Sequence, residues 1–376
     1  MRNILVIGAG KIGSVVAELL AGVAAANGDR NDYRVTVADR SAALLAGIET
    51  DARRPPHLTT LVLDVTDPVA LRAALYGRFA VLSAAPFNLT LSIARAARDA
   101  GVHYLDLTED VASTRAIREL AQGARSAFIP QCGLAPGFVA IVAADLARSF
   151  DTLDSVRLRV GALPAYPSNA LNYNLTWSTE GVINEYCEPC EAIVDGHLCS
   201  VPALEEREEF SLDGVLYEAF NTSGGLGTLC ETLAGRVRTL NYRTIRYPGH
   251  AAIMKALLHD LRLKDRRDVL KDILEQALPT TLQDVVIVFV TVAGLRDGRL
   301  QQETFVRKVY AHALGGRLRS AIQITTASSL CAMLDLLADG TLPRTGFVRQ
   351  EQVPLEAFLA NRFGRAYAAD ALAHAA

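Results

Sequence analysis

A glycine-rich turn near the start of the chain has the residue types and the spacing that hold a pyrophosphate. The segment "NILVIGAGKIG" places Gly8, Gly10 and Gly13 directly after an apolar run and at the start of a helical pattern. In such a turn the first glycine makes the tight bend, the second lets a phosphate approach the backbone, and the third lets helix and strand pack closely. The amides at the start of the helix then hold the phosphates. The motif therefore predicts a dinucleotide site, and a merely tight strand-to-helix turn is the weaker alternative.

An acidic residue at the end of the second apolar run sharpens this prediction. Asp39 follows "RVTVA" and is placed to accept hydrogen bonds from the adenine ribose, which favours NAD over NADP. Arg40 is the opposing signal, because an adjacent Arg can receive a 2′-phosphate. The spacing from Gly13 to Asp39 exceeds the usual value of about 20 residues, and the polar segment 27–33 explains the excess as a longer loop. The residues expected to line the cofactor are Gly8, Gly10, Lys11, Ile12, Gly13, Asp39, Arg40, Asp64, Val65, Ser83, Ala84, Ala85, Pro86 and Cys132.

The elements that must position these residues follow from an alternating pattern over the first 147 residues. Apolar runs such as "NILVIG", "RVTVAD" and "FAVLSAAP" are each followed by a helical pattern, about six times in all. This alternation predicts an α/β Rossmann domain with a doubly wound parallel sheet. Because ligands gather outside the carboxyl ends of parallel strands, five further residues should face the same crevice. They are Tyr104, Asp106, Thr108, Glu109 and Cys132.

A second glycine-bearing turn occurs in "QCGLAPGFVAIVAADLA", residues 131–147. It resembles the end of another strand of the same sheet, where the chain should leave the nucleotide domain. Pro136 pre-sets the first helical turn, and Gly133 and Gly137 allow the backbone to approach a ligand closely. We expect Ala135, between them, to be a neutral part of the substrate pocket wall.

The pattern changes after about residue 150. Segments 155–163 and 284–310 have the character of strands, and Asp-Gly pairs at 195, 213 and 297 each separate extended runs. Asp-Gly is one of the strongest short hairpin signals. This predicts a second α+β domain with a mainly antiparallel sheet at residues 138–318, for substrate binding and dimerisation. The apolar helical pattern that follows should pack back on the first domain, so that 1–137 and 319–376 form one discontinuous NAD-binding domain.

Three stretches of the second region combine polar and aromatic side chains, as small-ligand pockets do. The candidates from them are Trp177, Glu180, Asn184, Asn221, Thr222, Arg243, Arg246 and His250. An amino-acid carboxylate needs a cation, and Arg offers a two-pronged donor. Side chains alternate along a strand and 243 and 246 differ by an odd number, so both Arg cannot face the pocket if the strand is regular. One of them would then be a solvated edge residue.

Composition and charge exclude several classes of protein. A net charge of −3 provides no basic surplus for nucleic acid, and the apolar run 285–295 is far shorter than the ~20 residues that span a bilayer. Six cysteines in 376 residues do not make a disulfide framework. Cys187, Cys190 and Cys199 are a loose set for zinc, so we expect unreactive cysteines and no metal. A cytoplasmic homodimer or higher homo-oligomer is expected.

Taken together, the motifs resemble the saccharopine dehydrogenase family over nearly the whole chain. The resemblance rests on "VIGAGKIG", "VHYLDLTED", "QCGLAPG", "TWSTEGVINEY", "NTSGG" and "TIRYPGH". It implies a Rossmann domain, an α+β domain, a nicotinamide cofactor, and oxidation or reduction at a carbon–nitrogen bond. Members that form or cleave saccharopine usually have Asp before the Pro-Gly of the second turn, where this chain has Ala135. The neutral version, with "STEGVINEYCEPC", is more similar to the lysine 6-dehydrogenase members.

The reaction that this resemblance implies is the NAD-dependent oxidative deamination of the ε-amine of L-lysine. The products would be ammonia, NADH and 2-aminoadipate 6-semialdehyde, which cyclises to piperideine-6-carboxylate. Two alternatives stay open. A saccharopine or carboxynorspermidine reductase would need more cationic anchors for a longer, doubly acidic substrate, and a non-catalytic regulator would bind NAD without turning over an amine.

Roles for individual residues also follow from the implied chemistry. The amine must lose its proton before hydride can leave, and its free pKa is about 10.4, so the site needs a base or must lower that pKa. The candidates for proton handling are Asp106, Glu109 and His250. Arg246 would hold the α-carboxylate, and Glu180 or Asn184 the α-amine. The substrate-binding set is completed by Tyr104, Thr108, Ala135, Trp177, Asn221, Thr222 and Arg243.

Overall fold

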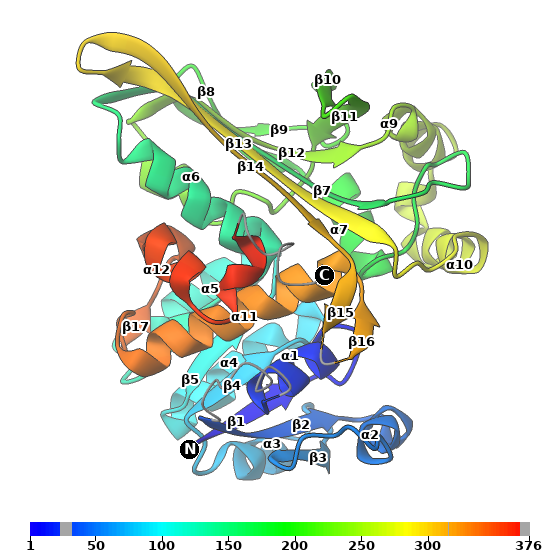
Figure 1. The fold of residues 1–376 in the computed structure, drawn as a ribbon, viewed down its shortest axis with the longest axis vertical. Coiled ribbons are helices and arrows are strands. Elements are labelled where there is room, and N and C mark those ends of the chain that lie inside the picture. The colour runs from blue at the N-terminus through cyan, green and yellow to red at the C-terminus, as the bar shows by residue number, and fades with distance from the viewer. Residues whose placement is uncertain (23–31, 315, 369–376) are drawn as a thin grey trace. The chain divides into compact units, whose positions relative to one another are not determined.

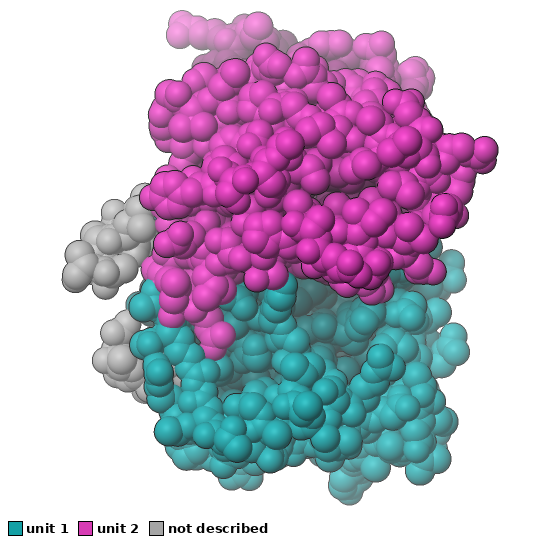
Figure 2. All heavy atoms as spheres, turned by 90° about the vertical axis from the view of Figure 1, so that its right-hand side faces the viewer, with its two compact units in different colours: residues 1–138, 313–317, 323–376 teal, residues 139–312, 318–322 magenta. Residues whose placement is uncertain are grey.

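Two large sheets and a separate two-stranded pair form in the computed structural model, which describes residues 1–22, 32–314 and 316–368. The strands of the pair are β15 (His312–Leu314) and β16 (Arg317–Arg319). The ribbon is shown in Figure 1. The chain divides into unit 1, with residues 1–138, 313–317 and 323–376, and unit 2, with residues 139–312 and 318–322 (Figure 2). Most of the polar segment 27–33, to which the long spacing before Asp39 was attributed, lies outside the described residues.

The sheet of unit 1 is parallel throughout, in the order β17-β6-β5-β4-β1-β2-β3. This order confirms the predicted doubly wound Rossmann fold. The order reverses at β1, which lies between β2 and β4, and ligands bind at the carboxyl ends on either side of such a switch point. The strands are β1 (Arg2–Ile7), β2 (Tyr33–Asp39), β3 (Leu58–Val62), β4 (Ala80–Ser83), β5 (His103–Asp106), β6 (Ala127–Ile129) and β17 (Gly346–Phe347).

The helices of unit 1 begin where local sequence signals place them. The Asp67 carboxylate accepts hydrogen bonds from the amides of Val69 and Ala70, and Pro68 lies in the first turn of α3, which are both common signals of a helix start. The helices are α1 (Gly13–Leu20), α2 (Ala42–Glu49), α3 (Pro68–Leu75), α4 (Phe87–Ala100), α5 (Val111–Ala121) and α12 (Leu355–Ala360). A further helix, α11 (Ala321–Asp339), is long and apolar enough to cross a membrane by length and composition. However, 89% of its most apolar window is buried, as in the core helix of a folded domain.

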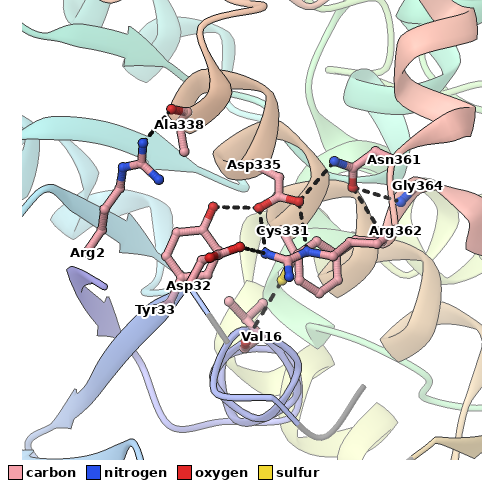
Figure 3. A network of polar contacts seen from close by, with 11 residues as sticks. Arg2, Val16, Asp32, Tyr33, Cys331, Asp335, Ala338, Asn361, Arg362 and Gly364 are labelled. Carbon is pink, nitrogen blue, oxygen red and sulfur yellow. Dashed lines mark hydrogen bonds and ion pairs between the residues drawn. The ribbon is translucent and has the colours of Figure 1, made fainter. Parts of the chain in front are cut away.

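A polar network centred on Asp335 joins α11 to the start of β2 and to the C-terminal segment (Figure 3). The Asp335 carboxylate accepts hydrogen bonds from the Tyr33 hydroxyl at 2.5 Å, from Arg362 at 2.9 Å and from Asn361 at 3.1 Å. Burial, together with the Asp335 charge, raises the pKa of Tyr33. The ion pair of Asp335 with Arg362 and the hydrogen bonds around it therefore connect residues 361 and 362 to α11 and to the start of β2 within unit 1.

The sheet of unit 2 has the order β10-β11-β12-β7-β13-β14, with β8 pairing β12 and β9. Among these pairs only β12 and β7 are parallel, so the prediction of a mainly antiparallel sheet in an α+β domain is confirmed. The strands are β7 (Thr152–Pro164), β8 (Cys190–Val194), β9 (His197–Val201), β10 (Glu208–Leu212), β11 (Val215–Asn221), β12 (Val237–Arg246), β13 (Asp284–Arg296) and β14 (Arg299–Tyr310).

The three Asp-Gly pairs form the tips of three hairpins, β8–β9, β10–β11 and β13–β14. Both residues of each pair have a positive φ, for example 53° at Asp297 and 71° at Gly298. A two-residue turn with positive φ at both positions matches the twist of the flanking strands. The hairpin prediction is therefore confirmed at all three places, and β13–β14 is the longest of them (Figure 1).

Helix packing in unit 2 brings α7 beside the end of β12. The Ser178 hydroxyl caps α7 (Thr179–Cys187) by accepting a hydrogen bond from the Gly181 amide at 3.1 Å. One face of α7 carries Val182, Ile183 and Tyr186 into an apolar cluster with residues of β11, α9 and α10. The other helices of unit 2 are α6 (Val139–Ala147), α8 (Leu229–Leu233), α9 (His250–Lys255) and α10 (Arg267–Ala277).

Candidate active site

The glycine turn after β1 is open at Gly10, where a phosphate could approach the backbone. At Gly8 and Gly13 the backbone is too closely packed to admit a side chain. A side chain on Gly8, whose φ is 103°, would lie 2.8 Å from the Ala84 carbonyl oxygen, and one on Gly13 would overlap the Gly8 carbonyl. Nothing lies within 4 Å of the corresponding position on Gly10. The helix α1 begins there without a side-chain cap at Ile12, so its first amides have no side-chain acceptor. This arrangement fits a dinucleotide pyrophosphate.

Asp39 fastens the end of β2 to that turn. Its two carboxylate oxygens accept hydrogen bonds from the Ala9 amide and the Ser41 amide, each at 2.8 Å. Each oxygen keeps a further lone pair, so the carboxylate can still accept from a ribose hydroxyl. At the end of β4, the Ser83 hydroxyl is buried and has no hydrogen-bond partner among the described residues. Both features fit the cofactor-binding roles predicted for these residues.

The remaining cofactor candidates differ in exposure. Asp64 accepts hydrogen bonds from the Thr66 amide and hydroxyl, which hold the pKa of its carboxyl below the usual value. Cys132 is fully buried and its thiol donates to the Ile129 carbonyl at 3.0 Å, so the side chain is not presented to a ligand. Lys11, Arg40, Asp64 and Pro86 are exposed, whereas Ile12, Val65, Ala84 and Ala85 are partly buried.

Asp106, at the end of β5, is buried with an exposure of 1% and accepts three hydrogen bonds. One oxygen accepts from the amides of Thr108 at 3.0 Å and Gln131 at 2.9 Å, and the other from the Tyr104 hydroxyl at 2.8 Å. Burial raises the pKa of Asp106 to about 6, although these hydrogen bonds oppose the rise. The carboxylate thus ties two turns of unit 1 together, and Tyr104 is fully buried beneath it.

Glu109 lies three residues further on, in a different environment. Burial raises the pKa of its carboxyl to about 7, and the charges of Asp110 and Asp106 add to the rise. Apart from its own backbone amide, no donor among the described residues bonds this carboxylate. The neighbouring Thr108 hydroxyl is used locally, since it accepts from the Asp110 amide at 3.2 Å. Of the two acids predicted to handle protons, Glu109 is therefore the one with free hydrogen-bonding capacity.

The second glycine turn is tightly built. A side chain on Gly137 would lie 2.5 Å from the Gln131 carbonyl oxygen, so this position requires glycine. Ala135 is in an extended conformation with φ of −138° and precedes a cis peptide bond to Pro136. It is partly exposed while its neighbours Leu134 and Pro136 are buried. Its place in the substrate pocket wall stays a prediction.

In unit 2, Arg246 is a buried cation, with an exposure of 2%. Its Nε donates to the Tyr186 hydroxyl and its Nη1 to the Ile245 carbonyl, each at 2.9 Å. Its guanidinium also lies 4.8 Å from the centre of the Tyr173 ring. Within the described ranges no carboxylate forms an ion pair with it, and the negative charge of Glu185 acts on it only from a greater distance. A buried charge is costly unless it is paired, so Arg246 has the character of an anion-binding residue.

Arg243, on the same strand, has different partners, as the odd spacing predicts. It forms ion pairs with Glu206 at 3.0 Å and with Glu208 at 3.2 Å. The same Glu208 also pairs with Arg159 at 2.6 Å. The charge of Arg243 is therefore already compensated inside unit 2, which argues against its predicted role in binding a substrate carboxylate.

Two polar candidates on α7 are also engaged elsewhere. Glu180 accepts a hydrogen bond from Lys271 at 2.6 Å, and Asn184 accepts from Arg267 at 3.4 Å. Residues four apart share one face of a helix, and the polar partners of this face, Lys271 and Arg267, both belong to α10. Both side chains thus already have partners within unit 2, and their contact with the α-amine stays a prediction.

Three other candidates of unit 2 lie in its interior. Asn221 donates to the Pro202 carbonyl at 3.4 Å, and the Thr222 and Thr244 hydroxyls lie 2.6 Å apart. Trp177 is partly buried against the apolar cluster of α7. Their roles in substrate binding stay predictions.

His250, the third candidate for proton handling, is buried with both ring nitrogens engaged. Nδ1 lies 2.8 Å from the Leu171 carbonyl oxygen and Nε2 lies 3.0 Å from the Tyr186 hydroxyl. Burial, and then the charge of Arg246, lower the pKa of His250 to about 3. A neutral imidazole without a free nitrogen is unsuited to exchanging a proton with a substrate.

Tyr186 and Tyr173 flank Arg246, and sequence reasoning missed both. Tyr186 follows Val182 and Ile183 at helical spacing and lies with them on the apolar face of α7. Only its hydroxyl is part of the site. The signal that could have found it is the polar tip of a Tyr on a core face, because a buried Tyr hydroxyl usually has a partner.

The cysteines show no arrangement suited to a metal. All six are free, and the part of the chain that the structure describes holds no group of three or more His, Cys, Asp or Glu residues that could bind a metal ion. Burial raises the pKa of both Cys187 and Cys190, which makes their thiols less reactive.

Comparison with known proteins agrees with the division into two units. A family model described as the saccharopine dehydrogenase NADP binding domain matches residues 4–129, and one described as the saccharopine dehydrogenase C-terminal domain matches residues 133–363. The chain belongs to the saccharopine dehydrogenase family. In this member of the family, the boundary between the two matched domains falls at the turn that Asp106 holds through the Gln131 amide.

One curated relative is the saccharopine dehydrogenase [NADP(+), L-glutamate-forming] of the yeast Saccharomyces cerevisiae. It is 27% identical over 279 residues, which are 70% of this chain and 59% of the yeast protein. The chain thus spans less than two thirds of the length of this relative. The apo structure of a saccharopine dehydrogenase (L-Glu forming) from the same yeast is similar with a TM-score of 0.73 and 20% identity. The match covers 93% of this chain and 94% of that one, and it shows a shared fold.

Proposed function

We propose that this protein is an NAD-dependent dehydrogenase that oxidises the ε-amine of L-lysine and releases ammonia. The observation that carries the proposal is Arg246, a buried guanidinium with no carboxylate partner among the described residues. Two nearby Arg residues, Arg159 and Arg243, are compensated by Glu206 and Glu208. One buried cation without an ion pair among the described residues matches a substrate with one carboxylate, as lysine has, although the more distant charge of Glu185 also acts on Arg246. A saccharopine-type substrate has more carboxylates and needs more cations.

The cofactor part of the proposal rests on Asp39. The matching family model and the yeast relative are both named for NADP, whereas an acid at the end of β2 repels a 2′-phosphate. The Asp39 carboxylate is also held in place by the Ala9 and Ser41 amides, so it cannot swing away from the ribose position without losing both hydrogen bonds. Arg40 is exposed beside it and supports the NADP alternative.

Proton transfer is assigned to Glu109. When bound, the nicotinamide supplies the acceptor for a hydride. Lysine is an ammonium ion at neutral pH, with a free pKa of about 10.4, and it must become an amine first. A carboxylate whose pKa is raised to about 7 is a stronger base than an ordinary Glu and is still ionised at slightly alkaline pH. Asp106 and His250 are reassigned to structural support, because their hydrogen-bonding atoms are occupied.

Arg246 binds the α-carboxylate of lysine in this proposal. A guanidinium offers two parallel N–H groups to a carboxylate, and burial strengthens such a charge-assisted bond. We further propose that the enzyme acts as a cytoplasmic homo-oligomer without a nucleic-acid or membrane partner.

The second candidate is a reductase of the saccharopine type, which the names of the matching family models and of the yeast relative favour. One assay separates the possibilities. Formation of the reduced cofactor is measured with lysine, ornithine, 1,5-diaminopentane and saccharopine, each with NAD and with NADP. We expect lysine with NAD to give the highest kcat/KM. Faster turnover of saccharopine supports the reductase, a preference for NADP overturns the role of Asp39, and NAD binding without oxidation of any amine identifies a regulator.

A further inference from the structure

A chain of hydrogen bonds runs from the Leu171 carbonyl through His250 and Tyr186 to Arg246. Each group in this chain has a fixed role as donor or acceptor. A carbonyl oxygen only accepts, so the 2.8 Å contact with Leu171 places the hydrogen of His250 on Nδ1. The neutral ring then has a lone pair on Nε2, to which the Tyr186 hydroxyl donates at 3.0 Å. The oxygen of Tyr186 is thereby free to accept from Nε of Arg246 at 2.9 Å.

This chain cannot carry a proton, because both of its ends are closed. The Leu171 carbonyl takes up no proton, and an Arg guanidinium does not lose one in proteins. His250 is also neutral, since burial and the charge of Arg246 lower its pKa to about 3. A role in holding Arg246 in one orientation remains.

The orientation that the chain imposes leaves one edge of the guanidinium open. Of its five N–H groups, Nε donates to Tyr186 and one on Nη1 donates to Ile245. Three N–H groups on Nη1 and Nη2 have no acceptor among the described residues. The Tyr173 ring covers the guanidinium at 4.8 Å, and the buried Tyr173 hydroxyl has no hydrogen-bond partner among the described residues.

We propose that Leu171, His250 and Tyr186 are positioning residues that fix Arg246 so that its Nη1–Nη2 edge binds a ligand carboxylate end-on. The Tyr173 hydroxyl is a further donor for the same carboxylate. The inference rests on the proposed function, because it takes the substrate to be an amino acid. Its physical basis is preorganisation: an Arg already held in its binding conformation loses less conformational freedom when the ligand arrives.

The first test compares substrates with and without the carboxylate. Tyr186→Phe keeps the ring and removes the hydroxyl that connects His250 to Arg246. We expect KM for L-lysine to rise about tenfold, while KM for 1,5-diaminopentane and kcat for both amines stay near the wild-type values. Tyr217→Phe is the matched control, because Tyr217 is a buried Tyr of unit 2 outside the chain, and it should leave the KM ratio of the two amines unchanged.

Two substitutions of His250 separate the links of the chain. His250→Gln can still present an oxygen to the Tyr186 hydroxyl, whereas His250→Asn can replace only the Nδ1–H that bonds Leu171. We therefore expect Gln to retain most of the preference for lysine over 1,5-diaminopentane and Asn to lose it. Equal effects of the two variants on the KM ratio, or a Tyr186→Phe variant whose ratio equals that of Tyr217→Phe, overturn the proposal.

The tautomer of His250 provides a readout that does not depend on turnover. In ¹⁵N-histidine-labelled protein, the His250 ring is assigned by the signals that disappear in the Gln variant. We expect a neutral ring with hydrogen on Nδ1 throughout the pH range in which the protein stays folded. Hydrogen on Nε2, or a ring that titrates near its ordinary pKa, overturns the chain even if lysine is the substrate. Failure of the proposed function is distinct: the wild type then oxidises no amine, and the tautomer alone decides the inference.

Discussion

Two buried charges at the ends of strands, Asp106 in unit 1 and Arg246 in unit 2, differ in how many of their hydrogen bonds are made inside the protein. Asp106 accepts three, from Thr108, Gln131 and Tyr104. Arg246 makes two and keeps three N–H groups without an acceptor among the described residues. Burial alone therefore does not identify a functional charge. The unused hydrogen-bonding capacity does, because a folded protein rarely leaves it buried without a reason.

The same contrast holds within unit 1 over three residues. The Asp106 carboxylate accepts hydrogen bonds from the backbone of two turns. Glu109 has a pKa raised to about 7, and no donor beyond its own amide bonds its carboxylate within the described residues. Asp106 is thus suited to holding the backbone in place, and Glu109 to exchanging a proton. Substitutions that remove only the charge of each residue test this division.

The largest effect is expected for Glu109→Gln. Removing a general base typically lowers kcat roughly 10²–10⁴-fold, while the similar shape of Gln preserves the fold. Because the base must be ionised, the wild-type kcat should rise with pH through about 7, and the Gln variant should lose this rise. The measurement is the pH dependence of kcat with lysine. A Gln variant with wild-type kcat and the same pH profile would mean that Glu109 does not handle the proton.

A smaller effect, confined to KM, is expected for Arg246→Ala. A hydrogen bond to a charged group contributes roughly 1.5–3 kcal/mol, so KM for lysine should rise about tenfold to a hundredfold. 1,5-Diaminopentane, which lacks the carboxylate, should be unaffected. Arg243→Ala is the control on the same strand, because its charge is compensated by Glu206 and Glu208. If KM rises equally for lysine and for 1,5-diaminopentane in Arg246→Ala, the role of this Arg is structural instead.

The smallest effect on turnover is expected for Asp106→Asn. The Oδ1 atom of the new Asn can still accept the hydrogen bonds from the Thr108 and Gln131 amides. The Tyr104 hydroxyl can turn to donate to the Thr90 carbonyl, which lies 3.4 Å away. Asp106→Ala instead leaves several buried donors unpaired, each costing about 1–3 kcal/mol, so its free energy of unfolding should fall markedly. A stable Asn variant without turnover would show that Asp106 takes part in the chemistry.

The pH dependence of stability gives the same variants a second readout. The pKa of Asp106 is about 6 in the folded state against an ordinary value of 3.8, so the folded state favours the protonated form. Its contribution to stability is then fully present below about pH 3.8 and is lost as the pH rises through about 6. The Asn variant should lack this decline when the free energy of unfolding is measured by denaturant titration at a series of pH values.

The sequence by itself determined the parts of this protein that depend on neighbouring residues. Gly8, Gly10 and Gly13 marked the dinucleotide turn, the alternation of apolar runs and helical patterns gave the parallel sheet, and the Asp-Gly pairs marked three hairpins. The odd spacing of Arg243 and Arg246 indicated that they would differ in surroundings. These features are local because strand alternation, helix periodicity and turn conformation are set within a few residues.

Only the tertiary structure decided which of the candidate charges are already compensated. The partners that saturate Asp106 and orient Arg246 come from distant segments: Gln131 lies 25 residues from Asp106, Tyr186 lies 60 from Arg246, and Leu171 lies 79 from His250. The same is true of the ion pairs that occupy Glu180 and Arg243. A sequence pattern gives the type of a side chain and indicates on which face of its helix or strand it lies. Whether its hydrogen-bond donors and acceptors are paired within the protein or remain available to a ligand depends on segments that only folding brings together.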